Sequence, residues 1–394
     1  MSEIKVNSIK GVAASTAAIT VNNTDGTCTA NLSNRQNRNL IINGAMEVAQ
    51  RGTTSTSNGY QTVDRFYINF ANTDEAPTQA QADVASGTTP YTLGFRKSFK
   101  ITNGNQTSGA GAADRMRLLY IVEAQDLAKS GWNYTDANSK ITLSFWIKSS
   151  VSQNFYFRVA TSDGTSYNFP METGVLTADT WTKVTKTISG NSNLTFNNDN
   201  GIGLYLSWAQ YRGTDNTDSG VALNTWTASG SGYTLFPDYT STWYTTNDAT
   251  WELTGVQLEV GSVATDFEHR SFADELRRCQ RYYFILADAS GGTNEYQLFN
   301  IHAYSVAQVE TVIDYSWANL RAVPSLIQGA GTNYFSAVNA GNTSILFGAF
   351  LIYQPSKRTA LLYQNSLSSA PSTGQAYRCQ FNNVAAYVAF DAEL

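Results

Sequence analysis

Alternating apolar residues in several short segments place the strongest constraint on how this chain can fold. Every second residue within 141–147 is apolar, and the same period of two recurs in 155–159 and 202–208. Successive side chains of a β-strand point to opposite faces, so each segment is expected to form a strand with one buried face. Turn sequences separate these segments at spacings typical of antiparallel sheets. The pattern predicts an all-β fold, with a β-sandwich over 39–268.

Composition supports this fold class and limits the possible partners. Charged residues make up 14% of the 394 residues, whereas soluble domains usually contain about 25%. The net charge is −5 and no Lys/Arg-rich run occurs, which argues against nucleic-acid binding. No apolar run approaches the roughly 18 residues of a membrane span, so membrane insertion is not expected. Cys28, Cys279 and Cys379 lie far apart, which favours free thiols and indicates neither a metal site nor a cofactor.

The segments on either side of 39–268 have different patterns. Residues 1–38 contain too few apolar residues to form a core, so we expect an extended segment that needs a partner surface. Residues 269–285 predict a connecting helix, with Ser271 as N-cap and Asp274 completing a capping box. Residues 286–394 return to β patterning and predict a second, smaller β-sandwich. Within the first sandwich, Gly255 is expected to mark a β-bulge.

One stripe of the predicted helix resembles a narrow coiled-coil seam. Phe272, Leu276, Cys279 and Tyr283 follow one another at steps of four, three and four residues. Such a stripe is typical of contacts between subunits, although about three turns is shorter than most coiled coils. The alternative is that the stripe packs against its own domain, and the sequence does not separate the two interpretations.

Aromatic residues gather in the segment between Trp208 and Trp251, where few aliphatic residues accompany them. Flat C–H faces of sugars stack on Trp and Tyr rings, and polar neighbours bind the hydroxyls, so this composition suits saccharide recognition. The alternative is that the rings hold a long excursion onto the sandwich. A second candidate surface lies near the C-terminus. The candidate binding residues are Trp226, Tyr233, Tyr239, Trp243, Tyr244, Tyr334 and Phe335.

Few residues of the chain suit catalysis. His269 and His302 are the only histidines, and no nucleophile motif accompanies them, so a Ser/His/Asp hydrolase is not expected. Asp64 next to Arg65 is interpreted as a buried salt bridge or a turn contact. Acidic turns such as that at Asp199 are interpreted as turn formers, because none has the full spacing of a calcium loop. We therefore expect no enzyme activity and no catalytic or metal-binding residues.

Six segments of the chain stand out as motifs, and the longest runs from Trp251 to Tyr283. They are NLIINGAMEVAQRGTT, VDRFYI, ITLSFWIKSS, WTKVTKTI, NNDNGIGLYLSW and WELTGVQLEVGSVATDFEHRSFADELRRCQRYY. Together these segments resemble a recurrent family of phage tail-fibre proteins with a carbohydrate-binding-module-like domain. The resemblance implies a jelly-roll sandwich ending at LTGVQLEVG, then a helix and a C-terminal head, in a homotrimer anchored through 1–38.

The same resemblance implies a function. Such a protein is a virion appendage of a tailed phage, assembled in the host cytoplasm, that adsorbs to polysaccharide or protein on the bacterial surface. Its residues 1–38 would bind other tail or capsid proteins. One alternative is a structural fibre or decoration on capsid or tail without receptor binding. A glycan depolymerase is a third, less favoured because the short repeats of a long parallel β-helix are absent.

Overall fold

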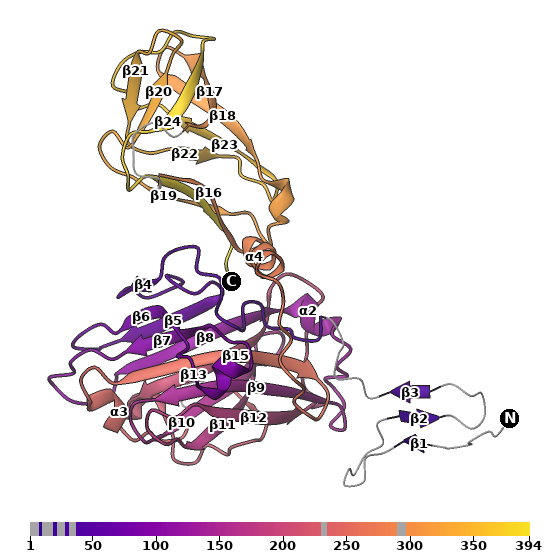
Figure 1. Ribbon diagram of the computed structural model, residues 1–394. Helices are drawn as coiled ribbons and strands as arrows, with labels where there is room; N and C mark the ends of the chain where they lie inside the picture. The colour runs from indigo at the N-terminus through magenta and orange to yellow at the C-terminus, as the bar shows by residue number, and fades with distance from the viewer. Residues whose placement is uncertain (1–7, 10–18, 22–27, 31–36, 230–234, 290–296) are drawn as a thin grey trace.

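The computed structural model describes residues 8–9, 19–21, 28–30, 37–229, 235–289 and 297–394. They form a small N-terminal sheet, a large β-sandwich and a C-terminal head (Figure 1). The N-terminal sheet stands apart from the sandwich and contains three short antiparallel strands, β1 (Ser8–Ile9), β2 (Ile19–Val21) and β3 (Cys28–Ala30). Most of the predicted anchor segment 1–38 lies outside the described residues.

The sandwich consists of two six-stranded antiparallel sheets. One has the order β14-β11-β10-β13-β8-β5 and the other the order β12-β9-β15-β7-β6-β4. Its strands are β4 (Thr54–Ser55), β5 (Phe66–Ala71), β6 (Thr78–Asp83), β7 (Lys97–Thr102), β8 (Arg115–Glu123), β9 (Lys140–Ser149), β10 (Asn154–Thr161), β11 (Tyr167–Val175), β12 (Thr182–Ser189), β13 (Ile202–Arg212), β14 (Thr227–Ala228) and β15 (Thr250–Val260). Its short helices are α1 (Thr89–Thr92), α2 (Ala124–Ala128), α3 (Thr242–Thr245) and the 3-10 turn η1 (Thr214–Asn216).

The predicted alternation is confirmed, and it builds the sandwich core. Phe145 of β9 is fully buried and meets Phe157 of β10 edge-to-face, with ring centroids 5.0 Å apart. The ring of Trp208 of β13 also meets Phe145, with ring centroids 5.7 Å apart. Because β9 belongs to one sheet and β10 and β13 to the other, these rings join the two sheets.

The bulge expected at Gly255 is confirmed. The pairing of β15 with β9 shifts register between Thr254 and Gln257, and Gly255 has φ +62°. A Cβ at Gly255 would lie 2.7 Å from the ring of Phe95, so a side chain would meet both backbone strain and a steric clash. The strand therefore changes its buried face at this glycine.

A helix is confirmed within the predicted range 269–285, including its cap, but α4 spans only Phe272–Gln280, and Tyr283 begins a strand instead. The side chain of Ser271 accepts a hydrogen bond from the backbone N–H of Asp274. The predicted seam, however, is not one exposed stripe. Phe272 is 58% exposed, whereas Cys279 is 1% and Tyr283 3% exposed, because the latter two pack inside the chain. Cys279 and Tyr283 therefore cannot belong to a seam between subunits, and that part of the prediction is wrong. Leu276 is half-buried.

The head places two further sheets around one core. Its strands are ordered β16-β25-β19 in the smaller sheet and β21-β20-β24-β17-β18-β23-β22 in the larger. They are β16 (Tyr283–Asp288), β17 (Gln297–Ser305), β18 (Gln308–Asp314), β19 (Ser325–Gly329), β20 (Phe335–Val338), β21 (Ser344–Phe347), β22 (Leu351–Tyr353), β23 (Thr359–Gln364), β24 (Ala376–Phe381) and β25 (Tyr387–Asp391), with the 3-10 turn η2 (Ser316–Ala318). Phe390 of the smaller sheet and Leu362 of the larger are both fully buried in this core.

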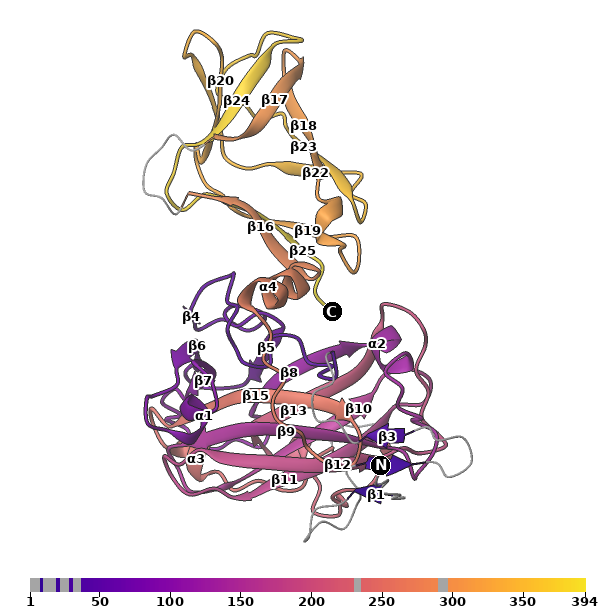
Figure 2. The same cartoon turned by 45° about the vertical axis from the view of Figure 1, so that its right-hand side comes forward.

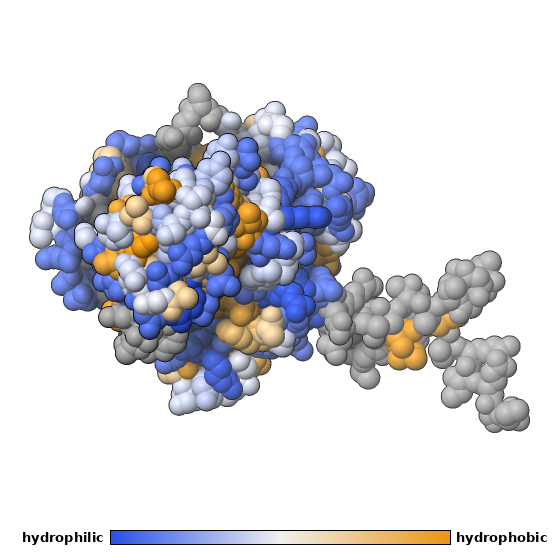
Figure 3. Space-filling model, turned by 90° about the horizontal axis from the view of Figure 1, so that it is seen from above, coloured by the Kyte–Doolittle hydropathy of each residue, from blue (hydrophilic) through white to orange (hydrophobic). Residues whose placement is uncertain are grey.

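The head and the sandwich meet at α4. The last residues of the chain return to this junction, next to the helix (Figures 1 and 2). Seen from above, the molecule is mostly hydrophilic with small, separate apolar patches (Figure 3). The all-β prediction is confirmed, and within the described residues no helix is long and apolar enough to cross a membrane.

Candidate functional site at the junction of sandwich and head

The smaller sheet of the head provides one wall of a pocket at the junction. Along β25, Val388 and Phe390 point into the core of the head, while Tyr387 and Asp391 line the pocket. Neighbouring strands add residues in the same register, with Tyr283 opposite Asp391 and Ile285 opposite Ala389. Side chains two residues apart in a strand share a face, so this wall follows directly from the strand pairing.

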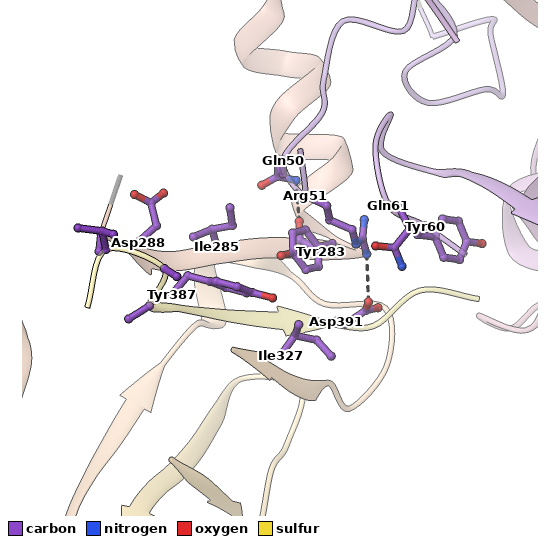
Figure 4. Close-up of a pocket in the computed structure, with 14 residues that line it drawn as sticks. Gln50, Arg51, Tyr60, Gln61, Tyr283, Ile285, Asp288, Ile327, Tyr387 and Asp391 are labelled. Carbon is purple, nitrogen blue, oxygen red and sulfur yellow. Dashed lines mark hydrogen bonds and ion pairs between the residues drawn. The ribbon is translucent and has the colours of Figure 1, made fainter. Parts of the chain in front are cut away.

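The sandwich provides the opposite wall, from the loops between 50 and 61. Gln50, Arg51, Tyr60 and Gln61 face the sheet of the head across the pocket (Figure 4). The Gln50 amide donates to the carbonyl oxygen of Tyr283 at 2.8 Å. The two walls are therefore joined directly beside the cavity.

Arg51 is the main charge at this site. Its guanidinium lies 3.7 Å from the ring centroid of Tyr283 and 3.1 Å from the carboxylate of Asp391. Burial alone would lower the pKa of Arg51, but the carboxylates of Glu393, Asp391 and Asp64 outweigh burial and raise it. The side chain is therefore a fixed cation, stacked on an aromatic ring.

Gly329 leaves room for the ring of Tyr387. The two residues are opposite each other in the pairing of β19 with β25. A Cβ at Gly329 would lie 2.0 Å from the carbonyl oxygen of Ala385 and 2.9 Å from Cδ1 of Tyr387. The glycine therefore determines where the tyrosine ring of the pocket can lie.

The chemistry of the pocket suits a polar ligand with apolar faces. The cavity volume is about 470 Å³, within the usual range of small-molecule sites. Tyr387, Ile285 and Ile327 offer apolar surface, while Gln50 and Gln61 offer amide donors and acceptors (Figure 4). Saccharides need this combination, because their ring faces stack on aromatic side chains and their hydroxyls bind amides and charges.

Asp64 and Arg65 lie behind this pocket, and they do not pair with each other. Arg65 forms an ion pair with Glu393 of the head, while Asp64 lies 3.9 Å from Arg51. Of the two predicted interpretations, a salt bridge between these neighbours is wrong, although both side chains are buried as expected. The guanidinium of Arg65 also stacks 3.3 Å from the ring centroid of Tyr282. Asp64 and Arg65 are adjacent in sequence but therefore contact different partners.

The aromatic residues predicted to bind sugar in the sandwich are mostly core residues. Trp243 and Tyr244 are fully buried and Trp226 is 9% exposed, so these rings have no open face for a ligand. Tyr244 stacks on Tyr211, with ring centroids 4.2 Å apart. Tyr239 is half-buried and donates its hydroxyl to the carbonyl oxygen of Tyr156. These rings hold the excursion onto the sandwich, as the alternative interpretation predicts. Tyr233 lies outside the described residues.

The two candidate binding residues of the head, Tyr334 and Phe335, also belong to or pack against a core. Phe335 is fully buried among Phe347, Phe350 and Phe381, so it is a core residue and not a contact. Tyr334 is half-buried and packs against the same core. Neither residue lines the junction pocket.

The remaining polar candidates make local contacts. Nε2 of His269 lies 2.9 Å from the carbonyl oxygen of Leu93, and His302 is an exposed strand residue 3.4 Å from Glu310. Asp199 accepts a hydrogen bond from the N–H of Gly201, as a turn-forming aspartate does. Cys279 and Cys379 are free and buried, and burial raises the pKa of both thiols.

The sequence does not predict the tyrosines that line the junction pocket. It places Tyr283 only in the helix stripe and does not distinguish Tyr60 or Tyr387 from other tyrosines. The alternation in YVAFD (387–391) does predict a strand with Val388 and Phe390 on one face. No local pattern indicates that its other face meets a loop of the sandwich more than 300 residues away.

Comparisons with known proteins found only distant likenesses. No family model matches the chain, and no curated protein matches it. Solved structures with a similar chain path include an enzymatically active domain of tailspike protein 4 from Bacteriophage CBA120, with a TM-score of 0.31 and 8% identity. The N-terminal cellulose-binding domain of Cellulomonas fimi β-1,4-glucanase C has a TM-score of 0.27 at 10% identity. A family 30 carbohydrate-binding module has a TM-score of 0.25 at 9% identity.

These matches cover the chain unevenly. The tailspike match spans 57% of this chain but 22% of that one, while the cellulose-binding domain is covered completely by 55% of this chain. The family 30 module is matched over 90% of its length by 59% of this chain. Likenesses this distant say nothing of what this chain binds. Its own sheets define the class of protein, which is an all-β protein with a large sandwich and a smaller β head.

Proposed function

We propose that this chain is a glycan-binding virion appendage, a tail fibre of a tailed phage that adsorbs to the bacterial surface without catalysing a reaction. The observation that carries the proposal is the pocket at the junction, which combines tyrosine rings, amides and a fixed arginine in about 470 Å³. A sugar ring would lie against Tyr387, with its hydroxyls toward Gln50 and Gln61.

The segments that resemble phage tail-fibre proteins support the same proposal, because three of them meet at this site. Gln50 and Arg51 belong to the first segment, Asp64 and Arg65 to the second, and Tyr283 ends the last. In this proposal the segments build the joint that positions the pocket, and 1–38 attaches the protein to other virion components. Assembly as a homotrimer would present three copies of the pocket, so weak single sites would give firm adhesion.

The experiment measures binding of the purified chain to cells of a susceptible bacterium and to its isolated surface polysaccharide. Tyr387→Ala removes an aromatic ring that lines the pocket. Binding is expected to fall about tenfold, a loss typical of one aromatic contact. Tyr387→Phe retains the ring and should retain most of the binding. Tyr304→Ala is the matched control, because Tyr304 is a 65% exposed tyrosine of the same head outside the pocket.

Two results would contradict the proposal. If Tyr387→Ala and Tyr304→Ala bound as wild type does, the pocket would not be the binding site. If the chain released new reducing ends from the polysaccharide, the non-catalytic part of the proposal would be wrong.

A further inference from the structure

The wall that the head contributes to the junction pocket has an aliphatic centre. Ile285 of β16 and Ile327 of β19 both lie opposite Ala389 of β25, so the three residues form one row across the sheet. Residues opposite each other in neighbouring strands share a face of the sheet. Ile285 and Ile327 line the pocket (Figure 4), whereas Ala389 is fully buried. We call these three residues the aliphatic row.

Tyr387 and Asp391 lie on either side of the aliphatic row along β25. Each is two residues from Ala389, and both line the pocket. Side chains two residues apart in a strand share a face and lie about 7 Å apart. A sugar ring stacked on Tyr387 would therefore place a substituent at its edge over the aliphatic row.

Two polar side chains of the sandwich, Gln50 and Arg51, are held beside the row of Tyr283 and Asp391. Those two residues are opposite each other in the pairing of β16 with β25. The Gln50 amide donates to the carbonyl oxygen of Tyr283 at 2.8 Å. Arg51 pairs with Asp391 at 3.1 Å and stacks 3.7 Å from the ring centroid of Tyr283. These contacts keep both side chains one row away from the aliphatic row.

Apolar side chains in this part of the pocket are open to a ligand. Ile327 is 38% exposed and Val384 60% exposed, and both line the cavity. Val384 belongs to the loop between β24 and β25, three residues before Tyr387. One exposed apolar side chain is common on a protein surface, but two that line the same cavity offer apolar area for a bound ligand to cover.

We propose that the junction pocket selects sugars that carry a methyl group, at C6 of a 6-deoxyhexose or in an acetamido group, and that this methyl lies on the aliphatic row. The inference rests on the proposed function and names the class of sugar that the same site takes. A methyl group there covers apolar surface, whereas a hydroxyl in its place loses hydrogen bonds to water and gains none from the aliphatic row. The pocket therefore discriminates between sugars that differ at this one group.

The test measures binding of the full chain to matched pairs of sugars, each coupled at equal density to polyacrylamide. The pairs are L-rhamnose with L-mannose, L-fucose with L-galactose, and N-acetylglucosamine with glucose. In at least one pair the sugar with the methyl group should bind about tenfold more tightly or better, as expected for one methyl group in an apolar site. Preference in either of the first two pairs assigns the C6 methyl, and preference in the third assigns the acetamido methyl.

Ile327→Thr is the first variant, because it keeps a β-branched side chain in β19 and replaces part of the apolar surface by a hydroxyl. It should reduce the preference for the methyl-bearing sugar about threefold or more without lowering affinity for its hydroxyl-bearing partner. Val384→Thr repeats the test at a loop residue with almost no change of shape. Val312→Thr is the control, since Val312 is a 66% exposed valine of the same head outside the pocket.

Equal binding within all three pairs, or tighter binding of the hydroxyl-bearing sugars, would overturn the inference. A preference that stayed unchanged in both Ile327→Thr and Val384→Thr would overturn it as well. If sugars bound without preference but Tyr387→Ala still weakened binding, the inference would fail and the proposed function would stand. If neither these sugars nor the surface polysaccharide bound in a way that depends on Tyr387, both proposals would fail.

Discussion

Arg65 of the sandwich and Glu393 of the head form an ion pair in which both side chains are almost fully buried, at 1% and 5% exposure. Arg65 also donates to the carbonyl oxygen of Ile121 at 2.8 Å. An ion pair between residues so far apart in the chain joins its two β units. We infer that this pair fixes the walls of the junction pocket relative to each other.

Breaking this pair should destabilise the protein strongly. Arg65→Met would leave the buried carboxylate of Glu393 with Arg51, at 3.5 Å, as its remaining ion-pair partner among the described residues. The free energy of unfolding should fall by about 3 to 5 kcal/mol, as for other buried pairs that lose one partner. The control is Lys97→Met, which breaks the solvent-exposed pair with Asp83 and should cost at most about 1 kcal/mol. Equal losses in urea unfolding would contradict the role of Arg65.

Asp64 should make stability depend on pH. Burial raises its pKa from 3.8 to about 6, against the opposing charge of Arg51. The folded chain therefore holds this proton more tightly than the unfolded chain, so protonation of Asp64 favours folding. Its contribution is present below about pH 4 and is lost as pH rises through 6, on the order of 3 kcal/mol.

The measurement is urea unfolding of wild type and Asp64→Asn at several pH values from 4 to 7. The difference in unfolding free energy between the two proteins should change with pH in this window, because asparagine does not titrate. Subtracting the variant removes the contributions of other carboxylates, such as Glu123 and Glu268. A difference that stays constant with pH would contradict the raised pKa of Asp64.

Gly329→Ala should disturb the pocket through backbone crowding. The new methyl group would lie 2.0 Å from the carbonyl oxygen of Ala385, so β19 and the loop before β25 must move apart. We expect a loss of about 1 to 3 kcal/mol, typical of overpacking, together with weaker glycan binding. In Gly341→Ala the nearest atom would be 3.5 Å away, so unfolding and binding should change little. Similar effects of both substitutions would argue against tight packing at Tyr387.

Trp243→Phe should affect stability without affecting binding. The indole N–H donates to the carbonyl oxygen of Thr250 at 3.0 Å and the ring is fully buried. Losing this bond and part of the ring should cost about 2 kcal/mol, measured by thermal unfolding. Glycan affinity at a temperature where the variant is folded should equal that of wild type. A specific loss of affinity would mean that the excursion between Trp208 and Trp251 does contact the ligand.

Local patterns predict several elements of this fold. The period of two in 141–147 predicts β9 because successive side chains of a strand point to opposite faces, so the pattern is contained within the segment itself. Ser271 and Asp274 predict the start of α4 for the same reason, since a helix cap is formed within one turn. Gly255 marks a bulge because few other residues tolerate its backbone conformation.

Long-range contacts explain what the sequence did not predict. The sequence leaves open whether Trp243 and Tyr244 bind a ligand or hold the excursion onto the sandwich, and only the folded chain shows that they are buried against the sandwich. The partner of Arg65 is Glu393, and no property of either local segment specifies that pairing. The junction pocket similarly combines 50–61 with 283–289 and 384–391, so it exists only once both β units are assembled.

The most direct test is a crystal structure of the full chain with an oligosaccharide prepared from the surface polysaccharide of a susceptible bacterium. We predict a sugar ring against Tyr387, with hydroxyls bonded to Gln50 or Gln61 and Arg51 still paired with Asp391. An oligosaccharide bound elsewhere, with the junction pocket empty at saturating concentration, would contradict the proposed site.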